Sequence, residues 1–292
     1  MLEKLTSYLP LIEKALAKQI EPLKSTLHPL LFAAASHTLL NPGKRIRPLL
    51  TLAATESLGG RVEDAIMPAC AIEILHTYSL IHDDLPSMDD DDLRRGKPTL
   101  HKLYGEGQAI LIGDLLLTLA FETLAANRTL SSDKIVDLMQ VLAKKAGGEG
   151  MILGQSLDLM SEGKPLSWEL LSEIHKRKTA DLICCCLEFG AIVAGASKET
   201  KKVLAVIAEE IGLSFQIIDD VLDVEGEVSI IGKPPLSDAS NEKTTSVSLL
   251  GLKEAKSLAK SLLASALQKT KSLDLKNPTL EELLPKLIYR LF

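Results

Sequence analysis

The chain has 292 residues, of which 46% are hydrophobic and 25% are charged, and its formal net charge at pH 7 is −6. This length suits one large domain or two small ones, and the composition is typical of a globular protein with a sizeable core. A negative chain without a long basic stripe is a poor candidate for nucleic-acid binding. Its four cysteines lack Cys-x-x-Cys spacing, so we expect buried apolar fillers in a reducing compartment rather than a zinc site.

Helical periodicity dominates the chain from its beginning. Apolar residues recur at spacings of three and four, which predicts helices over 2–17, 62–85, 109–126, 134–146, 168–193, 200–223, 252–269 and 279–291. No stretch shows sustained strand alternation, and no Asn-Gly hairpin signal is present. The turn residues between these ranges are too few to form an interdomain linker. The simplest architecture is one all-α domain over 1–292.

Two predicted helices, 109–121 and 181–194, are apolar on nearly every face, and such helices belong inside a domain. The range 109–121 is too short to span a bilayer, so we expect a core helix. Within it, we expect Asp114 to be a buried carboxylate that is hydrogen-bonded to a neighbouring helix. The first 18 residues mix charges with leucines and lack the apolar core of a signal peptide, so we expect a cytoplasmic protein.

One acidic cluster interrupts the apolar pattern of the helix that reaches residue 223. Asp219 and Asp223 are four residues apart, so both carboxylates lie on one helix face, with Asp220 beside them. Like charges at this spacing destabilise a helix unless a cation lies between them. Mg²⁺ prefers carboxylate oxygens together with substrate phosphates. The cluster therefore indicates a magnesium site that handles phosphate groups.

A second acidic cluster lies earlier in the chain. Pro86 disfavours helical geometry at the residue before it, so Asp83 and Asp84 should end a buried helix and Asp89 should lie in a turn that folds back. A solvated acidic loop is the alternative interpretation. The apolar helix before the cluster and the paired arginines at 94–95 favour a functional role. The spacing of an EF-hand calcium loop is missing.

Basic residues near these clusters suggest anion binding. Lys44 and Arg47 follow a turn, precede a helix and can converge on one phosphate, although such pairs are also common on surfaces. His76 lies on the same predicted helix as the first aspartates. Two interpretations of this residue stay open: a histidine with a structural role in the core, and a hydrogen-bond donor to a phosphate group. Lys178 opens the apolar helix at 181–194, and Lys233 and Lys243 follow the second cluster, although single lysines are weak evidence taken alone.

Together these residues resemble the bacterial farnesyl diphosphate synthase family of short-chain trans-prenyltransferases. The resemblance covers almost the whole chain and preserves the order and spacing of the family strings: GKRIRP at 43–48, YSLIHDDLPSMDDDDLRRGKPT at 78–99, GQSLDL at 154–159, KT at 178–179, FQIIDDVLD at 215–223, GK at 232–233 and KTT at 243–245. It implies the isoprenoid synthase fold, which is one all-helical polyprenyl synthase domain around a central apolar cavity, as a homodimer.

The resemblance also implies roles for individual residues. Carboxylates that face one another across the cavity mouth would hold Mg²⁺ against the diphosphate of the allylic substrate: Asp83, Asp84, Asp89, Asp219, Asp220 and Asp223. That diphosphate would also be bound by Arg94, Lys178, Thr179, Gln216, Lys233 and Lys243, of which Arg94 and Lys178 are catalytic candidates. The diphosphate of isopentenyl diphosphate would be bound by Lys44, Arg47, His76 and Arg95.

The implied reaction condenses an allylic diphosphate, dimethylallyl or geranyl, with isopentenyl diphosphate and releases diphosphate. Breaking the allylic C–O bond builds negative charge on the leaving group, which metals and cationic side chains stabilise most in the transition state. The carbocation that forms needs a dry cavity, since water would capture it. Two anion sites distinguish such an enzyme from a terpene cyclase, which needs only one.

The helix that leads to the first aspartates carries the predicted gauge of product length. Ser79 and Tyr78 lie four and five residues before Asp83, roughly 6–7.5 Å deeper at about 1.5 Å per residue. In the family, an aromatic residue here, with a two-residue insertion in the aspartate motif, looks like an arrangement for farnesyl diphosphate. A tyrosine in the core is the plain structural alternative, and it is compatible with the gauge.

One segment departs from the family pattern. Leu236 stands where the family shows glycine, next to Pro234 and Pro235, which puts the closure of this flap and the role of Lys233 in question. Two alternatives to a farnesyl diphosphate synthase remain. One is a geranyl or geranylgeranyl diphosphate synthase, and the other is a subunit of a heteromeric prenyl synthase, although such subunits typically lose one aspartate motif.

Overall fold

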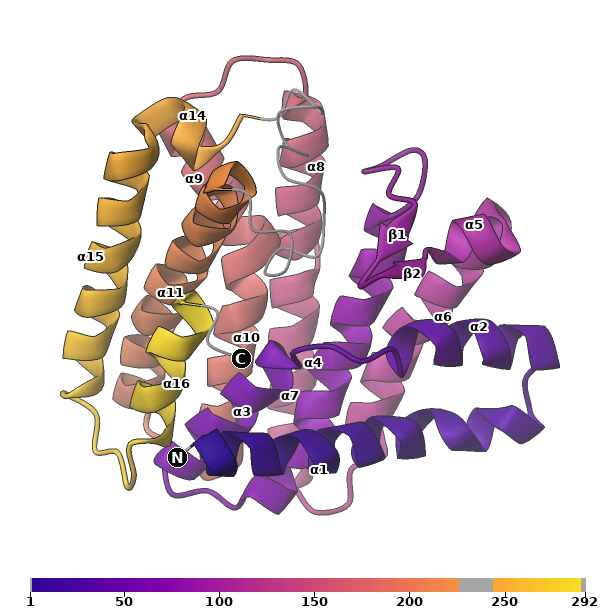
Figure 1. Cartoon of the computed structure of the whole chain (residues 1–292). Coiled ribbons are helices and arrows are strands. Elements are labelled where there is room, and N and C mark those ends of the chain that lie inside the picture. The colour runs from indigo at the N-terminus through magenta and orange to yellow at the C-terminus, as the bar shows by residue number, and fades with distance from the viewer. Residues whose placement is uncertain (1, 226–243, 290–292) are drawn as a thin grey trace. The chain divides into compact units, whose positions relative to one another are not determined.

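The structure is a computed structural model that describes residues 2–225 and 244–289 (Figure 1). The chain divides into two compact units, each described here by itself. The first comprises Met1–Leu52 and Val62–Met139, and the second comprises Ala53–Arg61 and Gln140–Phe292. The division falls inside two helices, α3 (Ile46–Ser57) and α7 (Ser132–Ala146), which therefore contribute to both units.

The first unit is mainly helical, as predicted. Besides the first part of α3 and of α7, its elements are α1 (Leu2–Ile20), the 3-10 turn η1 (Glu21–Ser25), α2 (Pro29–Leu39), α4 (Val62–Asp83), β1 (Leu93–Arg94), β2 (Lys97–Pro98), α5 (Leu100–Tyr104) and α6 (Glu106–Ala125). Its centre is α4, which packs closely on α6. A Cβ added to Gly113 of α6 would lie 2.1 Å from Nε2 of His82 on α4, so glycine is needed for this approach.

A short hairpin, which no alternation in the sequence indicates, follows the first aspartates. Leu93 pairs with Pro98 and Arg94 with Lys97. Arg95 and Gly96 connect the strands with φ values of 53° and 73°, the two positive values that a type I′ turn requires. Two-residue strands are too short to show alternation, and Arg-Gly is not the Asn-Gly or Asp-Gly pair that marks such turns most strongly.

Helix α6 is only partly buried, which contradicts the prediction for 109–121. Ile110 and Leu111 are 43% and 56% exposed, and Asp114 is exposed rather than buried. A helix that is apolar on every face does not show which face packs on α4, so the sequence pattern predicted more burial of α6 than the structure has. By length and composition alone α6 could cross a membrane, and 44% of its most apolar stretch is buried inside the structure.

The second unit contains the longest helix of the described residues. Its elements, besides the remaining parts of α3 and α7, are α8 (Met151–Ser161), α9 (Trp168–His175), the π-helical turn η2 (Lys176–Ala180), α10 (Asp181–Ala194), α11 (Lys198–Glu225), α14 (Ser246–Leu250), α15 (Leu252–Thr270) and α16 (Thr279–Ile288). Helix α11 packs on α10 and α15, and apolar residues of α11 and α15 form a buried cluster around Ile217 and Val221. The predicted helix 168–193 is in fact two α-helices joined by the π-turn.

The cysteines are buried, as predicted. Cys70 lies in α4, and the run Cys184–Cys186 lies in α10, whose apolar residues are nearly all buried. Burial raises the pKa of the Cys70 and Cys184 thiols to about 12. These thiols are therefore neutral at pH 7 and act as packing groups.

Candidate active site

The first aspartate motif has the geometry that Pro86 predicts. Helix α4 ends at Asp83, and the amide of Asp89 donates a hydrogen bond to the carbonyl of Asp83 at 2.9 Å. The chain therefore folds back within six residues and brings the backbone of Asp89 to the end of the helix. Asp83 and Asp89 are both half-buried at this turn.

Arg94 of strand β1 is bound by carboxylates of the same motif. Its Nε and Nη2 donate to Oδ1 of Asp84 at 2.8 and 2.5 Å, and Nη2 also donates to Oδ2 of Asp91 at 2.7 Å. Burial acts to lower the pKa of Arg94, but the charges of Asp84 and Asp91 outweigh it and raise the pKa. A substrate diphosphate that binds Arg94, or a metal ion that binds Asp84, would therefore compete with the ion pair between these two side chains.

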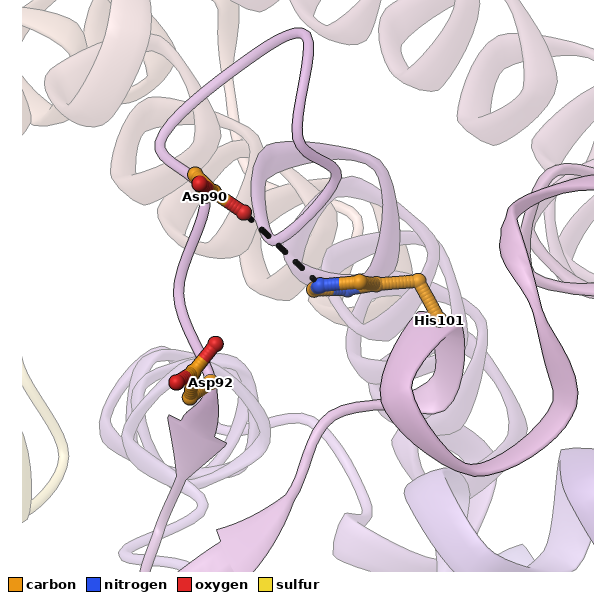
Figure 2. Close-up of side chains that lie close together, drawn as sticks. All are labelled: Asp90, Asp92 and His101. Carbon is orange, nitrogen blue, oxygen red and sulfur yellow. Dashed lines mark ion pairs between the residues drawn. The ribbon is translucent and has the colours of Figure 1, made fainter.

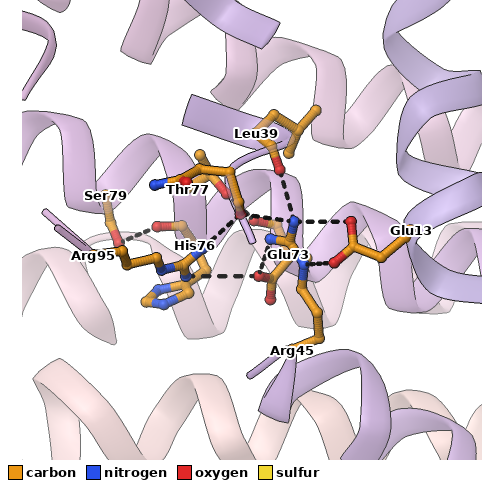
Figure 3. A network of polar contacts seen from close by, with 9 residues as sticks. Glu13, Leu39, Arg45, Glu73, His76, Thr77, Ser79 and Arg95 are labelled. Carbon is orange, nitrogen blue, oxygen red and sulfur yellow. Dashed lines mark hydrogen bonds and ion pairs between the residues drawn. The ribbon is translucent and has the colours of Figure 1, made fainter. Parts of the chain in front are cut away.

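The basic loop at 43–48 is held by its middle arginine (Figure 3). The side chain of Arg45 is fully buried, and its backbone is left-handed with φ 48°. Its guanidinium donates to Glu13 at 2.7 and 3.2 Å and to Glu73 at 2.9 Å. It also donates to the carbonyls of Leu39 and Asn41 at 3.0 and 3.1 Å. Buried guanidinium groups need such complete pairing, so this network fixes the loop between Lys44 and Arg47.

The same network reaches Arg95 in the hairpin turn. Nη2 of Arg95 lies 3.9 Å from Oε1 of Glu73, and its Nη1 donates to the carbonyl of Asn41 at 3.4 Å. A Cβ on Gly43 would lie 2.5 Å from the Arg95 guanidinium, so glycine lets the arginine lie across the loop. Glu73 is thus the common carboxylate of Arg45 and Arg95, and two segments 50 residues apart in sequence meet on it.

His76 lies on α4 among these arginines. Burial lowers its pKa well below the ordinary value, and the charges of Arg47 and Arg95, with smaller effects from two more arginines, lower it further. The imidazole is therefore neutral at pH 7. The structure brings together three of the four residues expected at the isopentenyl diphosphate site, Arg47, His76 and Arg95, while Lys44 is exposed at the edge of the same loop.

The predicted length gauge lies one turn before the aspartates. Tyr78 is 8% exposed, and its ring meets that of His82 edge to face with centroids 5.1 Å apart. Burial, and then the charges of Asp83 and Asp114, raise its pKa. The hydroxyl of Ser79 donates to the carbonyl of His76 at 2.9 Å within the same helix.

In the second unit, the π-turn η2 presents Lys178 and Thr179. Nζ of Lys178 donates to Oδ2 of Asp158 on α8 at 2.6 Å. A Cβ on Gly154 of α8 would lie 2.2 Å from the backbone nitrogen of Lys178, so α8 approaches the turn as closely as a glycine allows. π-turns inside helices are frequent at functional sites.

A chain of hydrogen bonds joins the π-turn to α11. Thr179 Oγ1 donates to Gln216 Oε1 at 2.9 Å, and Gln216 Nε2 lies 3.4 Å from Asp220 Oδ1. Asp220 Oδ2 accepts the amide of Ser246 at 2.7 Å, at the start of α14. Burial is the main reason that the pKa of Asp220 is raised. In this structure Asp220 therefore holds α14 and Gln216 in place.

His175 lies beside Asp220, with Nε2 at 4.0 Å from Oδ2. Burial lowers its pKa to about 4, so the ring is neutral at pH 7 and this contact is not an ion pair. The sequence reading gave no role to this residue.

The paired aspartates of the second motif lie on α11 as predicted. Asp219 is half-buried, and Asp223 is 6% exposed. Both are in the uninterrupted helix, four residues apart. The remaining predicted ligands of the allylic diphosphate, Lys233 and Lys243, lie outside the described residues, as do Pro234, Pro235 and Leu236.

Sequence reasoning missed the residues that hold the predicted ones. Arg45 and Glu73 fix the basic loop, and Asp158 and Gly154 fix the π-turn. Arg45 and residues 154–159 belong to family motifs that are visible in the sequence, so the sequence marks them as candidates. Their structural roles were missed because a contact between distant segments leaves no periodic signal in the sequence. Glu73 is the residue that the sequence could have indicated. It is a charged residue within the apolar run of α4, and a charge buried there needs a partner.

The described residues define an all-α enzyme in which carboxylate and arginine sets suited to diphosphates lie on separate segments. Comparison with protein families matches residues 28–283 to polyprenyl synthetase. Among similar proteins, the farnesyl diphosphate synthase of Micrococcus luteus is 42% identical over 99% of this chain and 98% of its own length. The chloroplastic geranylgeranyl pyrophosphate synthase 7 of Arabidopsis thaliana is 43% identical over 89% of this chain and 76% of its own length.

Among solved structures, the geranyltransferase of Helicobacter pylori, complexed with magnesium and isoprenyl diphosphate, superposes with a TM-score of 0.82. It is 39% identical and covers 97% of each chain. The chain belongs to the polyprenyl synthetase family. The predicted isoprenoid synthase fold and the predicted prenyltransferase activity are confirmed.

Proposed function

We propose that this prenyltransferase condenses geranyl or dimethylallyl diphosphate with isopentenyl diphosphate and releases farnesyl diphosphate as its main product. The observation that carries the proposal is the arginine cluster, which consists of Arg45, Arg47 and Arg95 around neutral His76 in the first unit. Arg47 and Arg95 of this cluster stand at the basic loop and in the hairpin turn, whereas the predicted magnesium ligands stand at the end of α4, on the turn after it and on α11. A condensing enzyme needs such a cluster because it binds two diphosphates at once. The near full-length match to a farnesyl diphosphate synthase supports the same reaction.

The donor set suits magnesium as the cofactor. Carboxylate oxygens and substrate phosphates are the ligands that Mg²⁺ prefers, and Asp83, Asp89, Asp219 and Asp223 supply the carboxylates. When bound, magnesium would neutralise charge on the departing diphosphate. Asp84 and Asp220 are weaker candidates for magnesium ligands, because their carboxylates already accept hydrogen bonds from Arg94 and from the Ser246 amide, respectively.

The side chains of this chain would divide the remaining work. Arg94 and Lys178, each oriented by a carboxylate, would bind the allylic diphosphate as charge builds on it. Arg47, Arg95 and neutral His76 would hold the diphosphate of isopentenyl diphosphate, with His76 donating one hydrogen bond. The allylic C–O bond breaks and diphosphate departs, and the homoallylic double bond attacks the allylic carbon. The tertiary cation that results loses a proton from the carbon next to the charged one, and the released diphosphate accepts this proton.

One incubation tests the activity. Purified protein with Mg²⁺, geranyl diphosphate and isopentenyl diphosphate should yield a C15 diphosphate, identified by mass spectrometry after dephosphorylation. Folded protein that forms no condensation product would contradict the proposal. A C20 main product would instead favour the geranylgeranyl alternative, for which the Arabidopsis relative is the supporting observation.

Tyr78 is the proposed gauge of product length. Tyr78→Ala should shift the product distribution beyond C15, because the ring fills space one turn before Asp83. His82→Ala, which removes the ring that Tyr78 packs against, is the matched control for disturbed packing. If Tyr78→Ala makes only the wild-type product, the assignment is wrong.

We also infer that the protein is a cytoplasmic homodimer and that residues 1–292 act as one catalytic domain. The family match runs through both units. The exposed apolar side chains Leu103, Ile110 and Leu111, on α5 and α6, offer a surface for a second copy. Light scattering of wild type and Leu111→Glu tests the dimer, which the charged variant should weaken. A single unfolding transition tests the single domain.

A further inference from the structure

Two carboxylates and one histidine gather beside the hairpin, outside the residues proposed to hold magnesium. The ligand atoms of Asp90, Asp92 and His101 all lie within 4.8 Å of one another (Figure 2). Asp90 and Asp92 come directly before β1, and His101 lies on α5. The three side chains come from two segments that the hairpin brings back together.

His101 is the unusual member of this group. Its side chain is 97% buried, at 3% exposure, and points its Nε2 toward Asp90 Oδ1 at 4.0 Å. Among the described residues Nε2 has no hydrogen-bond partner. A buried ring nitrogen without a partner is costly, so its environment calls for a group that it can bind.

The other ring nitrogen decides what that group is. The Thr99 hydroxyl has one hydrogen, which it donates to the carbonyl of Asp91 at 2.9 Å. Thr99 Oγ1 also lies 3.2 Å from Nδ1 of His101, so this contact needs the hydrogen on Nδ1. In the neutral ring Nε2 then carries a lone pair directed at the carboxylates. Such a bond at the second nitrogen is typical of metal-binding histidines.

A lysine occupies the position next to the carboxylates. Nζ of Lys102 lies 2.7 Å from Asp92 Oδ1 and 4.0 Å from Asp90 Oδ1. The side chains of Asp90 and Asp92 are 61% and 74% exposed, so both can rotate toward a common centre. Ligands of one zinc ion lie about 3–3.5 Å apart, since each is about 2.0–2.2 Å from the metal. The distances between the three ligand atoms would therefore need to shorten by roughly 1 Å to bind such an ion. Lys102 would have to leave its ion pair with Asp92.

We propose that Asp90, Asp92 and His101 bind one divalent cation of the imidazole-preferring class, for which Zn²⁺ is the probe. The donor set of two carboxylates and one imidazole differs from the all-oxygen set that suits Mg²⁺. Lys102 competes with the cation for the carboxylates. The site clamps β1 to α5, next to the turn that carries Asp89.

Equilibrium dialysis against ZnCl₂ tests the site, with excess Mg²⁺ present to occupy the aspartates that favour it. Wild type should bind one more Zn²⁺ per chain than His101→Gln. Asp92→Asn should weaken that binding about tenfold or more, because loss of even a group that only orients a metal ligand costs about 10–100-fold in affinity. Lys102→Met should tighten it, because the competing ammonium is removed.

The matched control is Asp133→Asn, which removes an exposed carboxylate at the start of α7, outside the group. It should bind as wild type does. Equal Zn²⁺ stoichiometry and affinity in wild type, His101→Gln and Asp92→Asn would overturn the proposal, and so would Lys102→Met that binds no tighter than wild type. If His101→Gln fails to fold, by circular dichroism, the exposed variants at 92 and 102 decide the question alone.

Discussion

The arginine cluster of the first unit and the aspartate helix of the second reach precise side-chain placement in opposite ways. The cluster stands on irregular backbone, with Arg45 and Arg95 both at positive φ, and a buried carboxylate holds it. The aspartates of α11 stand on regular helix, where spacing alone sets their positions. Irregular backbone can aim side chains from distant segments at one anion, but it needs buried ion pairs to persist. A helix needs none, but it aims along one face only.

The largest expected effect tests both aspartate motifs. Asp83→Ala and Asp219→Ala should each lower kcat by about 10²–10³-fold, comparable with removing one group that stabilises transition-state charge. Both variants should keep the wild-type circular dichroism, since neither side chain lies in the buried core. Asp137→Ala, at an exposed position of α7, is the control. A variant at 83 or 219 with near wild-type kcat would exclude that motif from catalysis.

Arg45 should affect stability more than any exposed charge. Arg45→Met leaves Glu73, whose side chain is 2% exposed, without its closest partner. Breaking a buried pair in this way typically costs about 3–5 kcal/mol. Urea unfolding measures the loss, with Arg128→Met at an exposed position as the control.

The double variant Arg45→Met/Glu73→Gln sharpens this test. It should recover part of the stability, because no charge is left buried without a partner. A loss below about 1 kcal/mol in Arg45→Met, the range of exposed pairs, would show that the network does not hold the loop.

A smaller loss is expected at the π-turn of the second unit. Gly154→Ala places a Cβ 2.2 Å from the Lys178 nitrogen, and overpacking of this kind costs about 1–3 kcal/mol. The turn must shift, so the KM for the allylic substrate should rise as well. Gly107→Ala is the matched control, since nothing lies within 4 Å of its added Cβ. Equal stability and KM in the two variants would contradict the close approach.

The smallest effect compares the two buried neutral histidines, one in each unit. The pKa of His76 is lowered well below its ordinary value, and that of His175 is lowered to about 4. An unfolded chain binds these protons below about pH 6.5, while the folded chain does not. Stability should therefore fall as the pH drops from about 6.5, by at most about 1.4 kcal/mol per pH unit for each histidine.

Unfolding experiments between pH 7 and 5 measure this slope. His76→Gln and His175→Gln should each flatten it. A slope that neither buried variant alters would mean that other groups cause the acid sensitivity. If only one variant flattens it, the units differ in how strongly they exclude water from their sites.

The sequence predicted most long helices within a few residues and both aspartate motifs in their observed local geometry. Helical spacing and Pro86 act over one or two turns, so the chain itself displays them. It predicted wrongly at α6, where Asp114 is exposed, and it did not reveal the hairpin, whose turn uses Arg95. In both places the outcome depends on which surfaces meet, and a periodic pattern carries no information about that.

Asp219 and Asp223 owe their shared face to sequence alone, because four residues make about one helical turn whatever surrounds them. The arginine cluster depended on tertiary structure. Arg45, Glu73 and Arg95 are far apart along the chain, and only the packing of α4 with the basic loop and the hairpin brings them to one buried carboxylate. Burial then makes that ion network necessary, since a charge without a partner inside a protein costs more than folding can readily offset.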